Sequence, residues 1–292
     1  MARLAFFGTP EAAVPTLVGL VDAGHDVALV VTRPDKRRGR GSASMPSPVK
    51  AAATDLGIPV SHDLGEVLSA RVEAGVVVAY GRIIPKALLD EVPMLNVHFS
   101  LLPRWRGAAP VERAVLAGDT ETGVSIMRLD EGIDTGPVLA RRVVAILDGE
   151  SAPDLEERLS REGADLMARL LEAGLGALPD GEPQSGEATY AAKIDPGELR
   201  IDWSRSADEL VRLVRLGRAW TPFRSKRLLV LRATALPEDP KGAPGTLAPG
   251  CKVATGNGTL VLEEVCPEGR RAMSAAEWVR GARLELPALV FG

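Results

Sequence analysis

Hydrophobic positions in the first eighty residues follow two alternating patterns. Short, wholly apolar runs predict strands buried on both faces, at residues 4–7, 27–31, 58–60 and 76–79. Between these runs, apolar residues recur at helical spacing over 11–23, 48–56 and 66–74. Strands and helices in alternation indicate βαβ units, so we predict an α/β fold with a doubly wound, mostly parallel, Rossmann-like sheet. Ligands of such sheets bind at the carboxyl ends of the strands.

The alternation continues beyond residue 90 and then stops. Strands are predicted at 94–98 and 122–128, and helices at 111–117 and 154–173. Residues 179–188 are rich in Pro, Gly and acidic side chains, which indicates a linker or an exposed loop. We therefore predict one domain over 1–187 and a linker over 188–203.

The chain after residue 203 has a different pattern. Two capping boxes, at 206–209 and 274–277, predict the starts of two short helices. Short apolar runs separated by Gly- and Pro-rich turns lie at 228–233, 252–254 and 260–265. Such short, closely spaced strands are typical of a small barrel or sandwich, which we assign to a smaller domain over 204–292.

Composition excludes several classes of protein. No apolar stretch approaches the roughly 20 residues of a membrane span, and Gly8 and Pro10 interrupt the N-terminus before a signal-peptide core could form. The only cysteines, Cys251 and Cys266, lack the partners of a disulfide framework or a zinc site. The loop at 8–11 lacks two of the glycines that bind a dinucleotide. We expect a cytoplasmic protein that uses no metal and does not contact a membrane.

The formal net charge of −4 hides an uneven distribution. Residues 1–197 contain 20 basic and 28 acidic side chains, whereas residues 198–292 contain 15 and 11. An acidic first part is therefore joined to a basic second part. The whole-chain charge does not exclude a nucleic-acid partner, because binding depends on local basic surfaces.

Side chains of the kinds that bind ligands or catalyse reactions are most concentrated in two segments. In the first, NVHFSLLPRWRGAAP at 96–110, Asn96 and His98 alternate along a strand end and so point to the same face. In the second, LDEGIDTGP at 129–137, Asp130 and Asp134 lie in a glycine-flanked loop that can fold back over the same sheet edge. Read alone, this short pattern is more simply explained by a core histidine at His98 and a turn former at Asn96, and either aspartate could simply cap its own turn.

These segments also carry a resemblance to a known family. The N-x-H-x-S-L-L-P and D-x-G-x-D-T-G pair, with FFGTPE, RPDKRRGRG, MPSPVK and VVVAYGRIIPKALLD, resembles the 10-formyltetrahydrofolate-dependent formyltransferases. YAAKID, RIDWSRSADEL and PGT extend the resemblance over almost the whole chain, toward the branch that formylates methionyl-tRNA. The resemblance implies an OB-like fold for the C-terminal domain. One departure is Phe99, where relatives carry a small residue or proline.

The resemblance implies formyl transfer from 10-formyltetrahydrofolate to the α-amino group of methionine on initiator tRNA, for translation initiation. In this reaction, direct amine attack gives a tetrahedral intermediate whose oxyanion needs hydrogen-bond donors. Asn96 and His98 are the candidate donors, and Asp134 is the candidate for orienting His98 and relaying a proton. Which of His98 and Asp134 is the formal base stays open.

The resemblance also assigns binding residues. For folate they are Ser100, Leu101, Leu102 and Pro103, with Arg82, Ile83 and Ile84, although core packing explains the isoleucines equally well. For tRNA we predict contacts in a basic loop and on one helix face, at Lys36, Arg37, Arg38, Arg40, Arg212 and Arg215. A solvated surface is the alternative for both basic groups.

Two other functions share these features. A folate-dependent formyltransferase could act on a small amine, such as a ribonucleotide or an amino sugar, and an RNA-binding relative could lack catalysis. The basic loop argues against the first, and the Asn96, His98 and Asp134 set argues against the second. We expect a monomer.

Overall fold

A computed structural model describes residues 1–37, 44–238 and 242–291 of the chain. The chain forms two compact units, and each is described by itself. Unit 1 comprises residues 1–111, 121–145 and 156–192, and unit 2 comprises residues 112–120, 146–155 and 193–292. The division at 187 and 203 drawn from the sequence stays a prediction.

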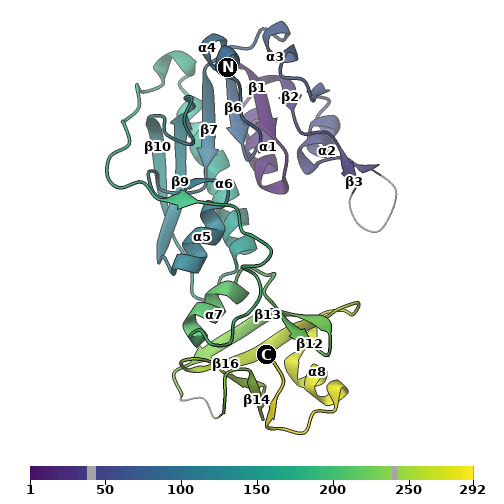
Figure 1. Ribbon diagram of the computed structural model, residues 1–292. Helices are drawn as coiled ribbons and strands as arrows, with labels where there is room; N and C mark the ends of the chain where they lie inside the picture. Colours follow the sequence, from purple (N-terminus) through teal and green to yellow (C-terminus); the bar gives the residue numbers. More distant parts are fainter. Residues whose placement is uncertain (38–43, 239–241, 292) are drawn as a thin grey trace. The chain divides into compact units, whose positions relative to one another are not determined.

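A seven-stranded, mostly parallel sheet is the centre of unit 1 (Figure 1). Its strands in spatial order are β10 (Val138–Ala145), β9 (Glu121–Arg128), β7 (Met94–His98), β6 (Ala74–Val78), β1 (Arg3–Gly8), β2 (Asp26–Val31) and β5 (Val60–Ser61). The five strands from β7 to β5 are parallel, while β9 and β10 are antiparallel to their neighbours. Strand order reverses between β1 and β6, which creates the switch point where such sheets bind ligands.

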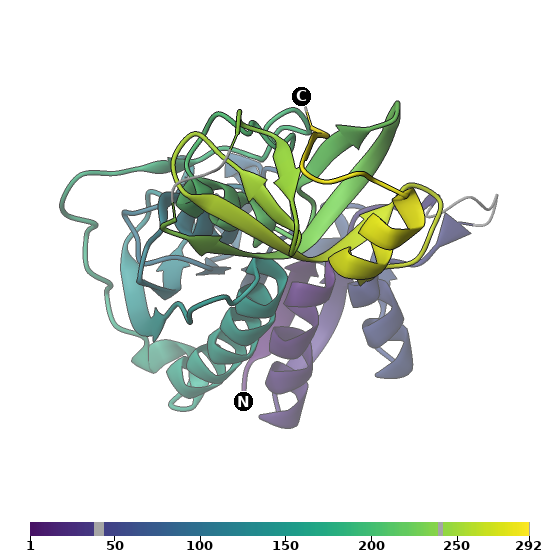
Figure 2. The same ribbon diagram turned by 90° about the horizontal axis from the view of Figure 1, so that it is seen from below.

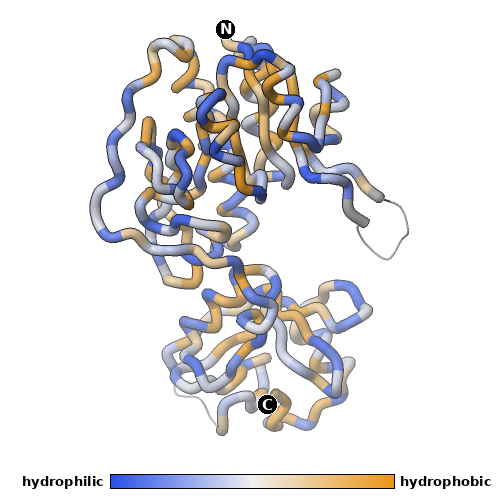
Figure 3. The backbone as a smooth tube through the Cα atoms, turned by 45° about the horizontal axis from the view of Figure 1, so that its top comes forward, coloured by the Kyte–Doolittle hydropathy of each residue, from blue (hydrophilic) through white to orange (hydrophobic). Residues whose placement is uncertain are grey.

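Helices cover both faces of this sheet: α1 and α6 lie side by side on one face (Figure 2), and α3 and α4 lie on the other. The helices with residues in unit 1 are α1 (Val14–Asp22), α2 (Pro48–Asp55), α3 (Glu66–Ser69), α4 (Lys86–Glu91), α5 (Pro110–Ala117) and α6 (Ala152–Leu171). On the face of α3 and α4, Phe7, Val31 and Val77 pack with side chains of these two helices. The strands between the helix layers are hydrophobic along their length (Figure 3), because both of their faces are buried.

Unit 2 contains a curled antiparallel sheet. Its strands are β12 (Trp220–Phe223), β13 (Lys226–Leu236), β16 (Thr259–Pro267), β15 (Lys252–Ala254), β14 (Thr246–Ala248) and β18 (Ala288–Leu289), with β17 (Met273–Ser274) paired to β16. Its core includes Trp203 and Trp278, which both stack on Phe291. The predicted fold class, a Rossmann-like α/β sheet with a smaller OB-like β domain, is confirmed.

Both predicted capping boxes are present. Ser206 and Glu209 begin α7 (Ala207–Val214), and Ser274 and Glu277 begin α8 (Ala275–Ala282). In each box the serine hydroxyl accepts from the N3 backbone, and the glutamate accepts from the serine backbone. A hydrogen bond from the Arg205 side chain, together with those from the side chain and backbone of Ser206, lowers the pKa of Glu209 to about 2.

Three elements of unit 1 are examples of differences from the prediction. The helix expected over 66–74 ends at Ser69, because the backbone of Glu73 already donates to Arg3 of the sheet. Helix α4 was not predicted, and neither was β10, which lies at the sheet edge and exposes Arg141. An edge strand tolerates charged side chains, so the apolar pattern that identifies buried strands is missing there.

Residues 1–37, 44–238 and 242–291 contain neither a helix suited to span a membrane nor a cluster of metal-binding side chains. None of their helices combines the length and apolar composition of a bilayer span. Likewise, no three His, Cys, Asp or Glu side chains in those ranges come together as a metal ion requires.

Candidate active site

Asn96 and His98 lie at the carboxyl end of β7, with exposed fractions of 8% and 6%. Met94, two residues earlier, packs into the apolar cluster on the α3 and α4 side of the sheet. Val97 and Phe99 face the opposite way, because both lie beside Gly163 of α6. Strand alternation therefore directs Asn96 and His98 to the face away from α6, and Phe99 away from them.

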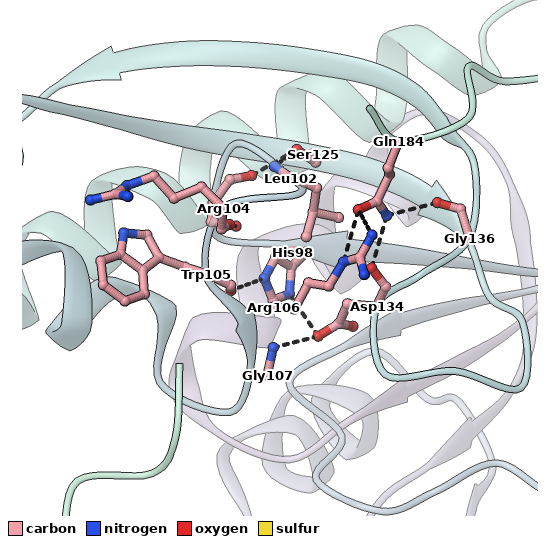
Figure 4. A network of polar contacts seen from close by, with 11 residues as sticks. His98, Leu102, Arg104, Trp105, Arg106, Gly107, Ser125, Asp134, Gly136 and Gln184 are labelled. Atoms are coloured by element: carbon pink, nitrogen blue, oxygen red, sulfur yellow. Dashed lines mark hydrogen bonds and ion pairs between the residues drawn. The ribbon is translucent and has the colours of Figure 1, made fainter. Parts of the chain in front are cut away.

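The imidazole of His98 has a hydrogen-bond partner at one nitrogen and a carboxylate near the other (Figure 4). Nε2 lies 2.8 Å from the carbonyl oxygen of Trp105, and Nδ1 lies 3.6 Å from Oδ2 of Asp134. A carbonyl oxygen can only accept a hydrogen bond, so Nε2 of His98 carries a proton and donates a hydrogen bond to the Trp105 carbonyl. The nitrogen that can exchange a proton is therefore Nδ1, which faces the carboxylate.

Asp134 reaches His98 from the loop between β9 and β10. Its Oδ2 accepts from the backbone N–H of Gly107 at 2.8 Å, and its side chain is only 15% exposed. Its φ of 52° lies in the left-handed region that few side chains other than Asn, Asp and His adopt readily. The fold thus brings the two predicted segments, 96–110 and 129–137, together at one carboxylate.

Asp130 behaves differently from Asp134. Its Oδ1 accepts from the backbone of Gly132 at 3.1 Å and from the hydroxyl of Thr135 at 2.6 Å. The alternative interpretation, an aspartate that caps its own turn, therefore describes Asp130. The loop also needs Gly136, since a Cβ there would lie 1.9 Å from the carbonyl oxygen of Arg128.

The predicted folate segment 100–103 forms a tight turn with a cis Leu102–Pro103 bond. The buried hydroxyl of Ser125 donates to the carbonyl oxygen of Ser100 at 2.7 Å and accepts from the N–H of Leu102 at 3.1 Å. The Ser100 hydroxyl donates to the carbonyl oxygen of Arg104 at 2.5 Å. Ser125 therefore fixes this turn from the neighbouring strand β9.

The second predicted folate segment lies between β6 and α4. Ile83 is 91% exposed, whereas Ile84 is buried in the apolar cluster, so core packing describes Ile84. Arg82 donates to the carbonyl oxygen of His62 at 3.5 Å. The buried Tyr80 hydroxyl has no hydrogen-bond partner in the described part of the chain. Burial raises the pKa of Tyr80, and the charge of Arg82 offsets part of that rise.

The predicted tRNA-binding residues fall into two groups. Lys36 and Arg37 form β3 (Lys36–Arg37), which pairs with β4 (Ser44–Met45), while Arg38 and Arg40 lie outside the described residues. In unit 2, Arg212 donates to the carbonyl oxygen of Ala117 at 3.1 Å.

Arg215, the last of the predicted tRNA contacts, donates to the carbonyl oxygen of Glu150 at 2.7 Å. Arg212 and Arg215 thus have structural contacts, and their role in tRNA binding stays a prediction.

Sequence reasoning missed the residues that hold His98 and Asp134 through the backbone. Trp105 and Gly107 act through a carbonyl and an N–H, which every residue type provides, so no sequence signal marks them. Gln184 was missed because it lies in residues 179–188, the stretch predicted to be a linker or an exposed loop. Just beyond that stretch, β11 (Tyr190–Ala191) pairs in parallel with β8 (Arg106–Gly107).

Comparisons with known proteins identify the family of this chain. Residues 2–171 match the family described as "Formyl transferase", and residues 193–283 match "Formyl transferase, C-terminal domain". A protein of Dinoroseobacter shibae named "Methionyl-tRNA formyltransferase" is 45% identical, covering 97% of this chain and 98% of its own. A protein of the same name from Thermus thermophilus is 46% identical, with 96% of each chain covered.

Among solved structures, HypX from Aquifex aeolicus in complex with tetrahydrofolic acid superposes with a TM-score of 0.67 at 17% identity. The match covers 96% of this chain and 47% of HypX, so this chain spans about half of that protein. At this identity the match supports the fold alone. The family matches and the nearly full-length relatives, taken with the fold, show that this chain belongs to the formyl transferase family.

Proposed function

We propose that this chain transfers the formyl group of 10-formyltetrahydrofolate to the α-amino group of methionine on charged initiator tRNA. The observation that carries the proposal is the nearly full-length similarity to two proteins named methionyl-tRNA formyltransferase. The buried His98 and Asp134 pair at the carboxyl edge of a parallel sheet supports it, because ligands of such sheets bind at that edge.

Two features of the edge suit a flat folate ring. Ile83 exposes an apolar side chain that a ring could cover. The buried Tyr80 hydroxyl has no hydrogen-bond partner among the described residues, and the polar rim of a ring could supply one. Arg82 to Ile84 and Ser100 to Pro103 would hold the folate between them. When bound, it supplies the formyl carbon and, as tetrahydrofolate, the leaving nitrogen.

Asn96 would stabilise the negative charge that develops on the formyl oxygen during amine attack. Its amide offers N–H donors on the face that His98 also occupies, and it is buried, so water competes little for them. One donor aimed at such a charge typically accounts for a factor of about 10² to 10³ in rate.

His98 and Asp134 would together accept the proton that the amine loses. With Nε2 donating to Trp105, the neutral ring directs its Nδ1 lone pair toward the Asp134 carboxylate. When a proton is taken up between Nδ1 and the carboxylate, the repulsion between the lone pair and the negative charge becomes an attraction. The pair can then return the proton to the folate nitrogen as the C–N bond breaks.

Lys36, Arg37, Arg38, Arg40, Arg212 and Arg215 are proposed to contact the phosphates of the tRNA. In this proposal the protein acts as a monomer in the cytoplasm, where charged initiator tRNA is used. The net basic charge of residues 198–292 supports an RNA partner for that part of the chain.

A formylation assay tests the function. Purified full-length protein is incubated with 10-formyltetrahydrofolate and, in parallel, with charged initiator tRNA, charged elongator methionine tRNA, an amino-sugar nucleotide and glycinamide ribonucleotide. We expect N-formylmethionyl-tRNA from the initiator at the highest rate. Formylation of a small amine alone would establish the small-molecule enzyme instead, and no transfer to any acceptor would leave the noncatalytic relative.

A further inference from the structure

The side chain of Gln184 joins the loop of Asp134 to the turn that follows His98 (Figure 4). Its Nε2 donates to the carbonyl oxygens of Asp134 and Gly136, both at 2.8 Å. Its Oε1 accepts from Nε and Nη2 of Arg106, at 3.0 and 2.7 Å. All these residues belong to unit 1.

An amide is the only common side chain that satisfies these partners. It has two N–H donors for the two carbonyl oxygens and one oxygen for the guanidinium, and all of these positions are used. The reverse orientation would place the amide oxygen against two carbonyls and its N–H groups against Arg106. The partners therefore fix which way the amide of Gln184 points.

Gln184 acts on both the backbone carbonyl and the side-chain carboxylate of Asp134. It holds the backbone carbonyl directly, at a residue with a left-handed φ of 52°. It holds the carboxylate indirectly, because Arg106 immediately precedes Gly107, the residue whose N–H binds Oδ2.

Thr189, from the same segment as Gln184, supports His98 through Trp105. Thr189 accepts from the N–H of Trp105 at 2.9 Å through its hydroxyl, and Trp105 in turn binds Nε2 of His98. The segment from Glu182 to Ala191 thus fixes the turn on one side and the aspartate loop on the other.

We propose that Gln184 is a positioning residue for formyl transfer: its amide sets the position of the Asp134 carboxylate relative to Nδ1 of His98. This inference rests on the proposed function, since it assigns Gln184 a role in that reaction. A displacement of about 1 Å at a catalytic group can cost about 100-fold in rate, so loss of the amide should lower kcat rather than substrate binding.

Two substitutions remove the N–H donors in different ways. Gln184→Glu keeps an oxygen for Arg106 but places a carboxylate oxygen against two carbonyls, and Gln184→Met keeps the length of the side chain without polar atoms. We expect both to lower kcat by about 10- to 100-fold while KM for tRNA and for folate stays within about two-fold. Gln184→Met buries no charge, so it tests the proposal even if Gln184→Glu does not fold.

Glu182→Gln is the matched control. It replaces Glu by Gln, the reverse of Gln184→Glu, two residues away, where the Glu182 carboxylate pairs with Arg141 at the surface. We expect its kcat to equal that of the wild type.

A double-mutant cycle separates positioning from general support of the fold. Adding Gln184→Met to Asp134→Asn should cause no further loss, because the carboxylate that Gln184 positions is already gone. Multiplicative losses, or a wild-type kcat in both Gln184 variants, would overturn the proposal. If the wild type forms no formylmethionyl-tRNA, the proposed function itself fails, which is a different result from a wild-type enzyme that is insensitive to Gln184.

Discussion

At the scale of residues, the candidate site depends on which side-chain atoms are already hydrogen-bonded to the backbone. The Trp105 carbonyl occupies Nε2 of His98, and the Gly107 N–H occupies one oxygen of Asp134. The sequence predicted that His98 and Asp134 would meet, but not that backbone groups would leave Nδ1 and the carboxylate facing each other. Side-chain types can be read from a motif, whereas backbone partners depend on how the turn folds.

Asp134→Asn is expected to lower turnover by about 10² to 10⁴, because a positioned base contributes that much to a rate. Asn tolerates the left-handed backbone at this position, so the loop should keep its shape. Single-turnover formylation measures the loss, and a filter-binding titration should show tRNA affinity unchanged. Asp130→Asn, in the same loop but bonded only to its own turn, is the control. Turnover within about two-fold of wild type in Asp134→Asn would remove this carboxylate from the mechanism.

At the scale of elements, a close helix approach supports the strand that carries Asn96 and His98. A Cβ on Gly163 of α6 would lie 2.7 Å from Cγ1 of Val97 in β7. The predicted helix over 154–173 and strand over 94–98 are both present, but the sequence did not reveal that they meet at this glycine. Local patterns predict elements, and packing between them depends on residues far apart in the chain.

Gly163→Ala is expected to destabilise the protein. Overpacking costs about 1 to 3 kcal/mol, which equals or exceeds the gain of about 1 kcal/mol from replacing a helical glycine. Gly19→Ala in α1 is the matched control, since its new Cβ would meet Ala164 at an ordinary 3.7 Å, and it should be neutral or stabilising. Urea unfolding followed by circular dichroism measures both. Higher stability in Gly163→Ala would show that the helix has room at that position.

At the scale of the whole molecule, charge is unevenly divided along the chain. The net charge is −8 over residues 1–197 and +4 over residues 198–292. Some basic side chains of unit 2 already contact groups of the same unit. Arg215 donates to the backbone carbonyl of Glu150, and the Arg227 guanidinium lies over the Trp220 ring. The basic segment at 33–50 is therefore the clearer candidate for RNA phosphates, because six basic residues occur there with one acid.

Replacing Arg38 and Arg40 together with Ala should weaken tRNA binding and reduce its dependence on salt. Each phosphate contact adds about 0.7 to 0.9 to the slope of log K against log salt, so losing two should reduce the slope by about 1.4 to 1.8. Binding titrations over a range of salt concentrations measure this slope. The double variant Arg161→Ala and Arg169→Ala removes the same charge from exposed positions of α6 and should leave the slope unchanged. Equal slopes in all three proteins would show that the basic segment does not contact phosphate.

The sequence by itself determined the fold class, the two capping boxes and the two motifs that carry Asn96, His98 and Asp134. It could do so because hydrophobic periodicity, cap residues and glycine-flanked acids act over a few neighbouring positions. Only the tertiary structure decided that Nε2 of His98 is engaged, that Asp130 serves its own loop, and that Gln184 lies against the Asp134 loop. These contacts join residues up to 50 positions apart, or use backbone atoms that all residues share, so no local pattern encodes them.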